Sequence, residues 1–448
     1  MKYSIMEKFL GQLISLGISI YMTRFFSPTD IGYYALATTV VSFIIVFSES
    51  GISSSVLVKK DLSLSDLSVL ISFVLIIGVI ILFAVEIGIY AFGGVLLDGT
   101  TCMLIAVLAL RIILVPVVNT LSNFLIREEN FSLLAKLKLT SVIMGSAAGL
   151  VALSRGLGIF SYAVMFLLQD IVALALLLIT AHKGLRFMLD RNVIRKYSKY
   201  GADLTAIGLF DYVFQLAHAF LLKSVFGSFA LGSYWRLNNI LTMASKLFSE
   251  GILRAYLPRL LRLNDVDLKT EYIRIWQPLM FLYSYLLYGV LSLIPLLLNF
   301  WDNGWQEAGI YLKYFLIAAL MYPWNYFHFS LIKIAPLDGR RWRYDAVKKI
   351  LLGVFLMAGY LLKSIELFML TYSISAVISW LVNVYLLQRT IGMDLRLEIK
   401  VLMSSLGLGI PWVITMSYID SNMVYIGLML LYGIGFIIKF REVYRIYA

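Results

Sequence analysis

One apolar segment near residue 240 carries a polar face that could bind an anion. At 100° per residue its members fall within an arc of about 80°: Arg236, Asn239, Lys246, Glu250 and Arg254. Guanidinium forks match phosphate oxygens, and arginine stays charged at any physiological pH. We therefore predict substrate contacts from Arg236, Asn239 and Lys246. For Lys246, an ion pair with Glu250 one turn away is the open alternative.

Two further polar stripes could carry a coupling ion. Asp211 and His218 lie on one helical face with Gln215, and an acid beside a histidine in a membrane helix suits a proton relay or a Na⁺ ligand. Glu49 lies on another stripe, whose other members are Thr38, Ser42 and Ser53. We predict ion coupling at Asp211, His218 and Glu49, and an internal structural network is the alternative.

Three more basic residues are candidate substrate contacts: Arg111, Lys223 and Arg24. Arg111 is isolated among apolar residues, so it either pairs with an acid from another helix or lines a cavity. Lys223 and Arg24 lie near the ends of their segments, where snorkelling to lipid headgroups is the alternative. Trp301 and Trp305 lie at predicted membrane boundaries, which favours an interpretation as interfacial anchors.

The composition places these residues in a membrane. Of 448 residues, 61% are apolar and 14% charged, and the mean hydropathy is +0.87, whereas a soluble domain carries about 25% charged residues. The single cysteine, Cys102, excludes an internal disulfide, and no HExxH-type pairing occurs. The sequence thus predicts an all-α polytopic membrane protein with no metal site, no cofactor and no catalytic residue.

The distribution of charge predicts the topology. About fourteen apolar segments can span a bilayer, and the intervening segments on one side hold 30 of the 38 lysine and arginine residues. The positive-inside rule then places both termini in the cytoplasm. Basic runs such as 340–343 are topology signals on this interpretation, and nucleic acid is not an expected partner. The predicted spans are 5–26, 31–57, 67–95, 103–125, 139–154, 159–181, 203–225, 231–253, 276–300, 308–332, 350–363, 367–388, 401–418 and 421–438.

An internal repeat organises these spans. At an offset of 200 residues, Phe26 matches Phe226, Gly32 matches Gly232 and Tyr34 matches Tyr234. Both copies lie at the outer turn between the first and second helix of a six-helix set, which predicts two parallel six-helix halves. The expected organisation is an N-terminal lobe (1–181), a basic cytoplasmic linker (182–202), a C-terminal lobe (203–388) and two additional helices (389–448).

Specific motifs extend this architecture to a family. The stretch RFFSPTDIGYYALA (24–37), FSESGI (47–52) and KDL (60–62), with ALGSYWR (230–236) and LPRL (257–260) in the second half, resembles bacterial polysaccharide exporters and O-antigen flippases. Their superfamily also contains lipid II flippases and multidrug and toxin extruders. The resemblance is sharpest over residues 10–65 and 205–263. Many O-antigen flippases have twelve spans, so the subfamily stays open.

The resemblance implies a function. Such proteins move a polyprenyl-diphosphate-linked oligosaccharide across the bacterial cytoplasmic (inner) membrane by alternating access, for surface polysaccharide assembly. It implies a lipid-linked glycan as substrate, membrane lipid as surroundings, and polymerase and glycosyltransferase partners. Whether H⁺ or Na⁺ couples transport stays open. The alternatives are a multidrug efflux antiporter, which would favour an acidic cavity, and a membrane polysaccharide polymerase, which would need a larger external loop.

Overall fold

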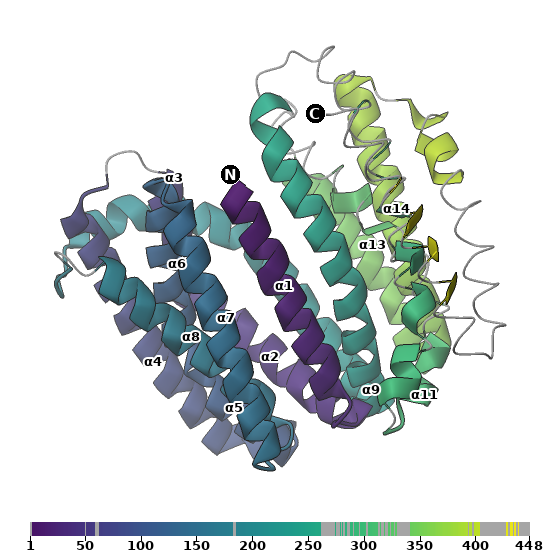
Figure 1. The fold of residues 1–448 in the computed structure, drawn as a ribbon, viewed down its shortest axis with the longest axis horizontal. Helices are drawn as coiled ribbons and strands as arrows, with labels where there is room; N and C mark the ends of the chain where they lie inside the picture. The colour runs from purple at the N-terminus through teal and green to yellow at the C-terminus, as the bar shows by residue number, and fades with distance from the viewer. Residues whose placement is uncertain are drawn as a thin grey trace. The chain divides into compact units, whose positions relative to one another are not determined.

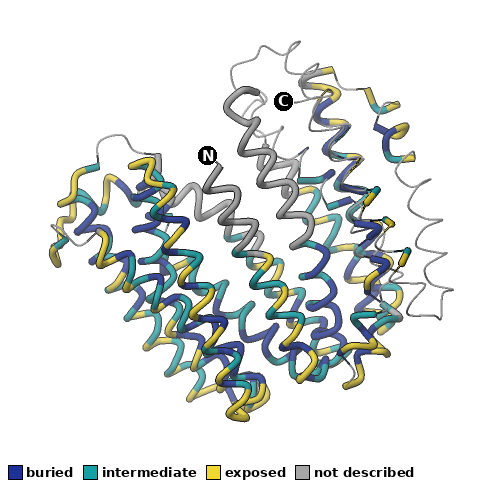
Figure 2. The backbone as a smooth tube through the Cα atoms, viewed as in Figure 1, coloured by how far each residue is buried: buried dark blue, intermediate teal, exposed yellow. Residues whose placement is uncertain are grey.

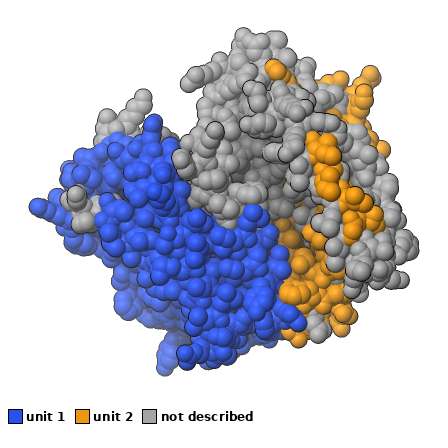
Figure 3. Space-filling model, viewed as in Figure 1, with its two compact units in different colours: residues 1–235 blue, residues 236–448 orange. Residues whose placement is uncertain are grey.

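The computed structural model describes residues 2–49, 51–58, 62–181, 185–260, 341–392, 394–396 and 398–403, and parts of 274–328 and 427–438. Most of these residues are helical, with no strand in this part of the chain. They form two compact units, Met1–Trp235 and Arg236–Ala448, which are coloured separately in Figure 3. Each unit is described by itself below.

Unit 1 is a bundle of long apolar helices (Figure 1). Its elements are α1 (Lys2–Thr23), α2 (Pro28–Glu49), α3 (Ile52–Val58), α4 (Leu64–Leu96), α5 (Gly99–Ala109), α6 (Arg111–Arg127), α7 (Phe131–Ser154), α8 (Phe160–Ala181) and the larger part of α9 (Arg191–Leu260). A bilayer needs about 20 helical residues. The described residues provide seven helices long and apolar enough to cross a membrane, so the predicted class is confirmed, whereas the count of fourteen is not.

Local signals set the helix boundaries in unit 1. The Ser63 hydroxyl and the Asp66 carboxylate form a capping box that starts α4, since each satisfies an end amide. The Asn130 side chain accepts from the Leu133 amide at the start of α7. Inside α9, Gly227 has φ 86° and ψ 172°, a backbone region that glycine tolerates. The chain therefore bends at Gly227, where the predicted turn between spans 203–225 and 231–253 lies.

Packing in unit 1 follows the rules of helices in lipid. A buried apolar cluster joins α3, α4, α6, α7, α8 and the start of α9 around Val56, Leu121 and Tyr197. In α7, Gly145 and Gly149 lie one turn apart against Met165 of α8, and a Cβ on Gly145 would lie 2.6 Å from the Met165 carbonyl oxygen. Small residues allow such close approach where lipid supplies no hydrophobic force. Large apolar side chains on α4 are exposed (Figure 2), as expected of a lipid-facing helix.

Unit 2 contains the end of α9, α11 (Trp305–Ala308), η1 (Gly309–Tyr311), α13 (Arg341–Leu361) and α14 (Ile365–Ile391). The helices α13 and α14 form a hairpin in which a Cβ on Gly359 would lie 2.5 Å from the Phe368 Cα. Ser364 caps the start of α14, and Gly392 in the left-handed conformation ends it, as is common at helix C-termini. The predicted lobe boundaries at 182–202 and 389 remain a prediction.

Candidate functional site

The two glycines matched by the repeat pack against each other's helices. A Cβ on Gly32 of α2 would lie 2.0 Å from the Ser228 carbonyl oxygen, and a Cβ on Gly232 of α9 would lie 1.7 Å from the Pro28 carbonyl oxygen. Pro28 and Ser228 are themselves 200 residues apart, so the contact is reciprocal. We call these four residues the glycine crossing. It brings the two repeat elements together at the N-terminal ends of α2 and of the second part of α9.

Aromatic side chains surround this crossing. The Tyr34 ring stacks on Tyr162 of α8 at a centroid distance of 5.1 Å and meets Trp235 of α9 edge-on at 5.7 Å. His218 lies 4.9 Å from the ring of Tyr234, the repeat partner of Tyr34. Offset and edge-on aromatic pairs stabilise by about 0.5–1.5 kcal/mol each beyond burial. The predicted coupling residue His218 thus packs on an aromatic ring from the other side of the bend at Gly227.

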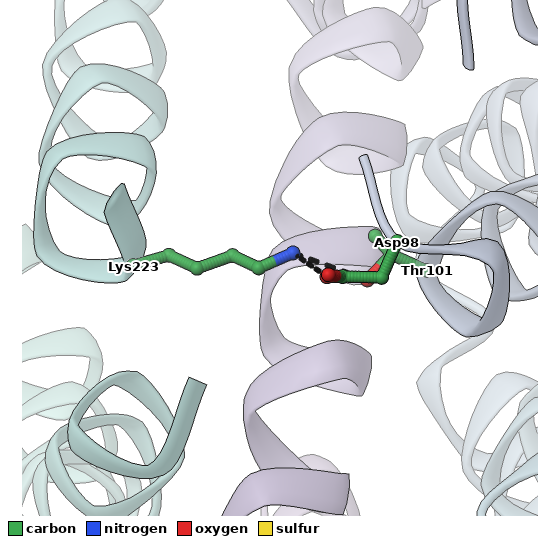
Figure 4. A network of polar contacts seen from close by, with 3 residues as sticks. All are labelled: Asp98, Thr101 and Lys223. Carbon is green, nitrogen blue, oxygen red and sulfur yellow. Dashed lines mark hydrogen bonds and ion pairs between the residues drawn. The ribbon is translucent and has the colours of Figure 1, made fainter. Parts of the chain in front are cut away.

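Lys223 is held by an acid that the sequence did not single out. Its ammonium group forms an ion pair with Asp98, the N-cap residue of α5, and lies 3.5 Å from the Thr101 hydroxyl (Figure 4). The same group lies over the Tyr33 ring. This pair lowers the pKa of Asp98 below the ordinary value of 3.8, because a neighbouring cation favours the ionised carboxylate. Lys223 therefore has protein partners on α5 and α2.

Arg111 is also paired. Its Nε donates to Asp170 Oδ2 of α8 at 2.6 Å, and its guanidinium lies over the Phe166 ring at 5.3 Å. The side chains are 20% and 12% exposed, so both charges are largely removed from solvent. Of the two roles left open for Arg111, the structure gives it pairing with an acid from another helix, and we leave it out of the substrate site.

Arg236 has a different environment, within unit 2. It is buried at 3% exposure, and its guanidinium carbon lies 5.4 Å from the centroid of Trp301. Trp301 and Trp305 are fully buried and pack together at 5.0 Å. The interpretation of these tryptophans as interfacial anchors was wrong, because residues that follow a predicted span can still be covered by their own unit.

Glu49 lies in a polar cluster where a helix is interrupted. The α2 helix ends at Glu49, Gly51 has φ 64°, and α3 starts at Ile52. The carboxylate accepts from the Ser53 hydroxyl and from Asn119 Nδ2 of α6 at 3.5 Å. Asn123 Nδ2, one turn further along α6, donates to the Ser53 carbonyl at 2.7 Å. Carboxylate, amide and hydroxyl groups from three helices thus meet at a break.

The remaining predicted site residues are less informative. Arg24 is exposed, and the Asn239 carbonyl accepts from the Thr242 hydroxyl at 3.3 Å. The side chains of Asp211 and Lys246 lie outside the described residues.

Unit 2 contains polar contacts that the sequence did not predict. The Tyr322 hydroxyl donates to Asn238 Oδ1 at 2.6 Å and lies 2.8 Å from the Tyr372 hydroxyl. His328 Nε2 lies 3.2 Å from Glu398 Oε1, and both side chains are fully buried. These contacts join residues 50 to 84 positions apart in the chain, so helical spacing carried no signal for them.

A family model identifies the chain. The model described as "Polysaccharide biosynthesis protein" matches residues 21–302. The chain belongs to this family. A relative from Klebsiella pneumoniae, described as an uncharacterized membrane protein in the cps region, is 21% identical over 253 residues, which cover 55% of this chain and 51% of that protein. The chain therefore spans about half the length of this relative.

Solved structures show the fold of this polysaccharide biosynthesis protein. The lipid II flippase MurJ in an inward closed conformation is similar with a TM-score of 0.70, at 15% identity and over 99% of both chains. An inward-facing multidrug resistance MATE transporter of the MOP superfamily has a TM-score of 0.61, at 13% identity, over 85% of this chain and 95% of that one. A MOP superfamily transporter from Pyrococcus furiosus has a TM-score of 0.56, at 13% identity, over 87% and 96%. The predicted resemblance and fold class are confirmed.

Proposed function

We propose that this multi-pass membrane protein translocates a polyprenyl-diphosphate-linked oligosaccharide across the bacterial cytoplasmic membrane by alternating access. The family match over residues 21–302 carries the proposal, and the similarity of the fold to a lipid II flippase supports it. The positive charges on one side of the predicted topology support cytoplasmic termini. An anionic diphosphate needs fixed cations to lower the cost of entering a low-dielectric region.

Arg236 is the anion contact in this proposal. The N–H groups of a guanidinium point within its plane, whereas the Trp301 ring lies over the guanidinium carbon of Arg236. An aromatic face also fixes the orientation of the group and adds a cation–π attraction. A diphosphate oxygen pair in that plane would receive a bidentate hydrogen bond.

Glu49 is the proposed coupling residue. Interrupted membrane helices often hold the coupling ion of a transporter, because the end carbonyls of the first half are freed there. Glu49 is the last residue of α2, just before the break at Gly51. Ser53 and Asn119 contact its carboxylate. Protonation of the carboxylate and binding of Na⁺ by its oxygens are both compatible with this chemistry, and transport assays at varied pH and Na⁺ concentration separate them.

The test uses cells in which the chromosomal copy is replaced by variants at equal membrane levels. Arg236→Ala and Arg236→Lys should lower surface polysaccharide at least tenfold and cause lipid-linked precursor to accumulate, since lysine lacks the planar fork. The control is Arg155→Ala, which removes an exposed arginine from the end of α7 and should have no effect. Normal surface polysaccharide in both Arg236 variants would exclude Arg236 as the anion contact. Normal polysaccharide in cells without the protein would overturn the function itself.

A further inference from the structure

The glycine crossing and the Lys223–Asp98 pair lie at one end of unit 1. Pro28 begins α2, Asp98 precedes α5, and Lys223 lies one turn before the bend at Gly227. Pro28 and Asp98 follow odd-numbered predicted spans and Lys223 lies at the end of one, so a chain with a cytoplasmic N-terminus places all three on the external side. We call this the external end of unit 1.

The ion pair at this end joins segments that the repeat assigns to different halves. Asp98 lies in the first six-helix set, between its third and fourth predicted spans. Lys223, 125 residues later, lies in the first span of the second set. The glycine crossing joins the same two sets through Gly32 and Gly232. Any movement that parts the two sets externally must break both contacts.

The pair is built to be reversible. The Asp98 side chain is 48% exposed, whereas that of Lys223 is 15% exposed, so water reaches the carboxylate and can replace the ammonium group there. Lysine presents a point charge on a flexible stem, which makes its contact easier to release than a bidentate arginine contact. By comparison, Asp170 in the Arg111–Asp170 pair of the first set is only 12% exposed, so water reaches that carboxylate far less. A permanent structural contact would be expected to resemble that second pair.

We propose that Asp98 and Lys223 form an external latch, which holds the external end closed beside the glycine crossing and is released when the protein opens outward. The inference rests on the alternating-access part of the proposed function. Thr101, 3.5 Å from the ammonium group, and the Tyr33 ring position Lys223 for re-closure. The latch gives a reason for a lysine at the outer end of an apolar span.

The test measures the opening of the external end in intact cells. Ser228→Cys in a Cys102→Ser background places one thiol at the glycine crossing, and a membrane-impermeant maleimide reports its exposure. Asp98→Asn and Lys223→Gln should each raise the labelling rate about two- to fivefold, as expected for the loss of an exposed ion pair. The charge-exchanged double variant Asp98→Lys/Lys223→Asp should return the rate toward that of the parent.

Arg155→Gln is the matched control, because it removes an exposed cation on the same predicted side; its rate should equal that of the parent. Unchanged labelling in both single variants, or a double variant as fast as the singles, would overturn the latch. So would labelling of Ser228→Cys from the cytoplasmic side alone.

A second measurement tests the latch if Asp98→Asn or Lys223→Gln fails to reach the membrane. A thiol cross-linker between Asp98→Cys and Lys223→Cys should lower labelling of the Ser228→Cys thiol below the parent rate, and no decrease would again count against the latch. Labelling does not depend on the cargo. The two proposals can therefore fail separately. If labelling responds to the variants but cells without the protein make normal polysaccharide, the proposed substrate is refuted and the latch is not.

Discussion

Replacing either glycine of the crossing with alanine should destabilise the protein, although alanine is the better helix former. The added methyl group would lie 2.0 Å from the Ser228 oxygen in Gly32→Ala and 1.7 Å from the Pro28 oxygen in Gly232→Ala. A comfortable carbon–oxygen contact is about 3.3 Å, so the two helices must separate by roughly 1.3–1.6 Å at this point. Backbone atoms are the obstacle, and no side-chain rotation can relieve the overlap.

The size of the effect follows from two opposing contributions. Overpacking costs about 1–3 kcal/mol, while alanine in place of a helical glycine gains up to about 1 kcal/mol. Net destabilisation of about 1–2 kcal/mol is therefore expected for each variant. The double variant should cost less than the sum, because the first methyl group already moves apart the helices that the second would push. If the crossing closes the external end, the same energy favours the open state about 5- to 30-fold.

Thermal unfolding in detergent measures the stability, and thiol labelling at position 228 measures the opening. Gly88→Ala in α4 is the matched control, since a Cβ there meets no atom within 4 Å; it should be neutral or slightly stabilising. Stability of Gly32→Ala and Gly232→Ala equal to that of Gly88→Ala would show that the close approach of α2 and α9 does not exist in the native protein.

Three further predictions concern ionisable pairs. Arg111→Met and Asp170→Asn should each lower stability by about 2–4 kcal/mol, less than for a fully buried pair, and the double variant should be milder than the sum in unfolding measurements. Because the pKa of Asp98 is lowered, the stability from the latch is present above the ordinary aspartate pKa and is lost only as pH falls through the lowered value. The labelling rate at position 228, corrected with an exposed reference thiol, should therefore be constant from about pH 5 to 8. Glu398→Gln keeps an oxygen for His328 and should be milder than Glu398→Ala, which leaves a cavity and an unsatisfied buried group at a cost of about 2–4 kcal/mol; equal melting temperatures for these two variants would contradict the buried contact.

Patterns that depend on local spacing were predictable from the sequence. Apolar content determined the fold class, and the 200-residue repeat selected Gly32 and Gly232, where an added Cβ would lie 2.0 and 1.7 Å from a backbone oxygen of the other element. Helical spacing also placed Glu49 and Ser53 on one face, and their side chains are in contact, although the helix is interrupted between them at Gly51, which the spacing did not predict. Each of these signals requires only the geometry of one helix or the comparison of two similar segments.

Pairing between distant segments was not predictable in the same way. The sequence marked Arg111 and Lys223 as charges that need partners, but the partners Asp170 and Asp98 are 59 and 125 residues away. Their identity depends on which helices pack together, and helix packing in lipid depends on small residues and shape. Trp301 was missed for the same reason, since its contact with Arg236 is made across the fold of unit 2.

The two contacts at the external end divide the work of closing it. The glycine crossing brings backbones together but offers only dispersion and weak Cα–H···O contacts, because lipid removes the hydrophobic gain of helix association. An exposed ion pair adds at most about 1 kcal/mol. A closure assembled from such modest contributions leaves both states populated, since a difference of a few kcal/mol gives a minor state of about 0.1–10%. An arginine in place of Lys223 could make a bidentate contact with Asp98 and would hold this end closed more firmly, so Lys223→Arg should slow labelling at position 228.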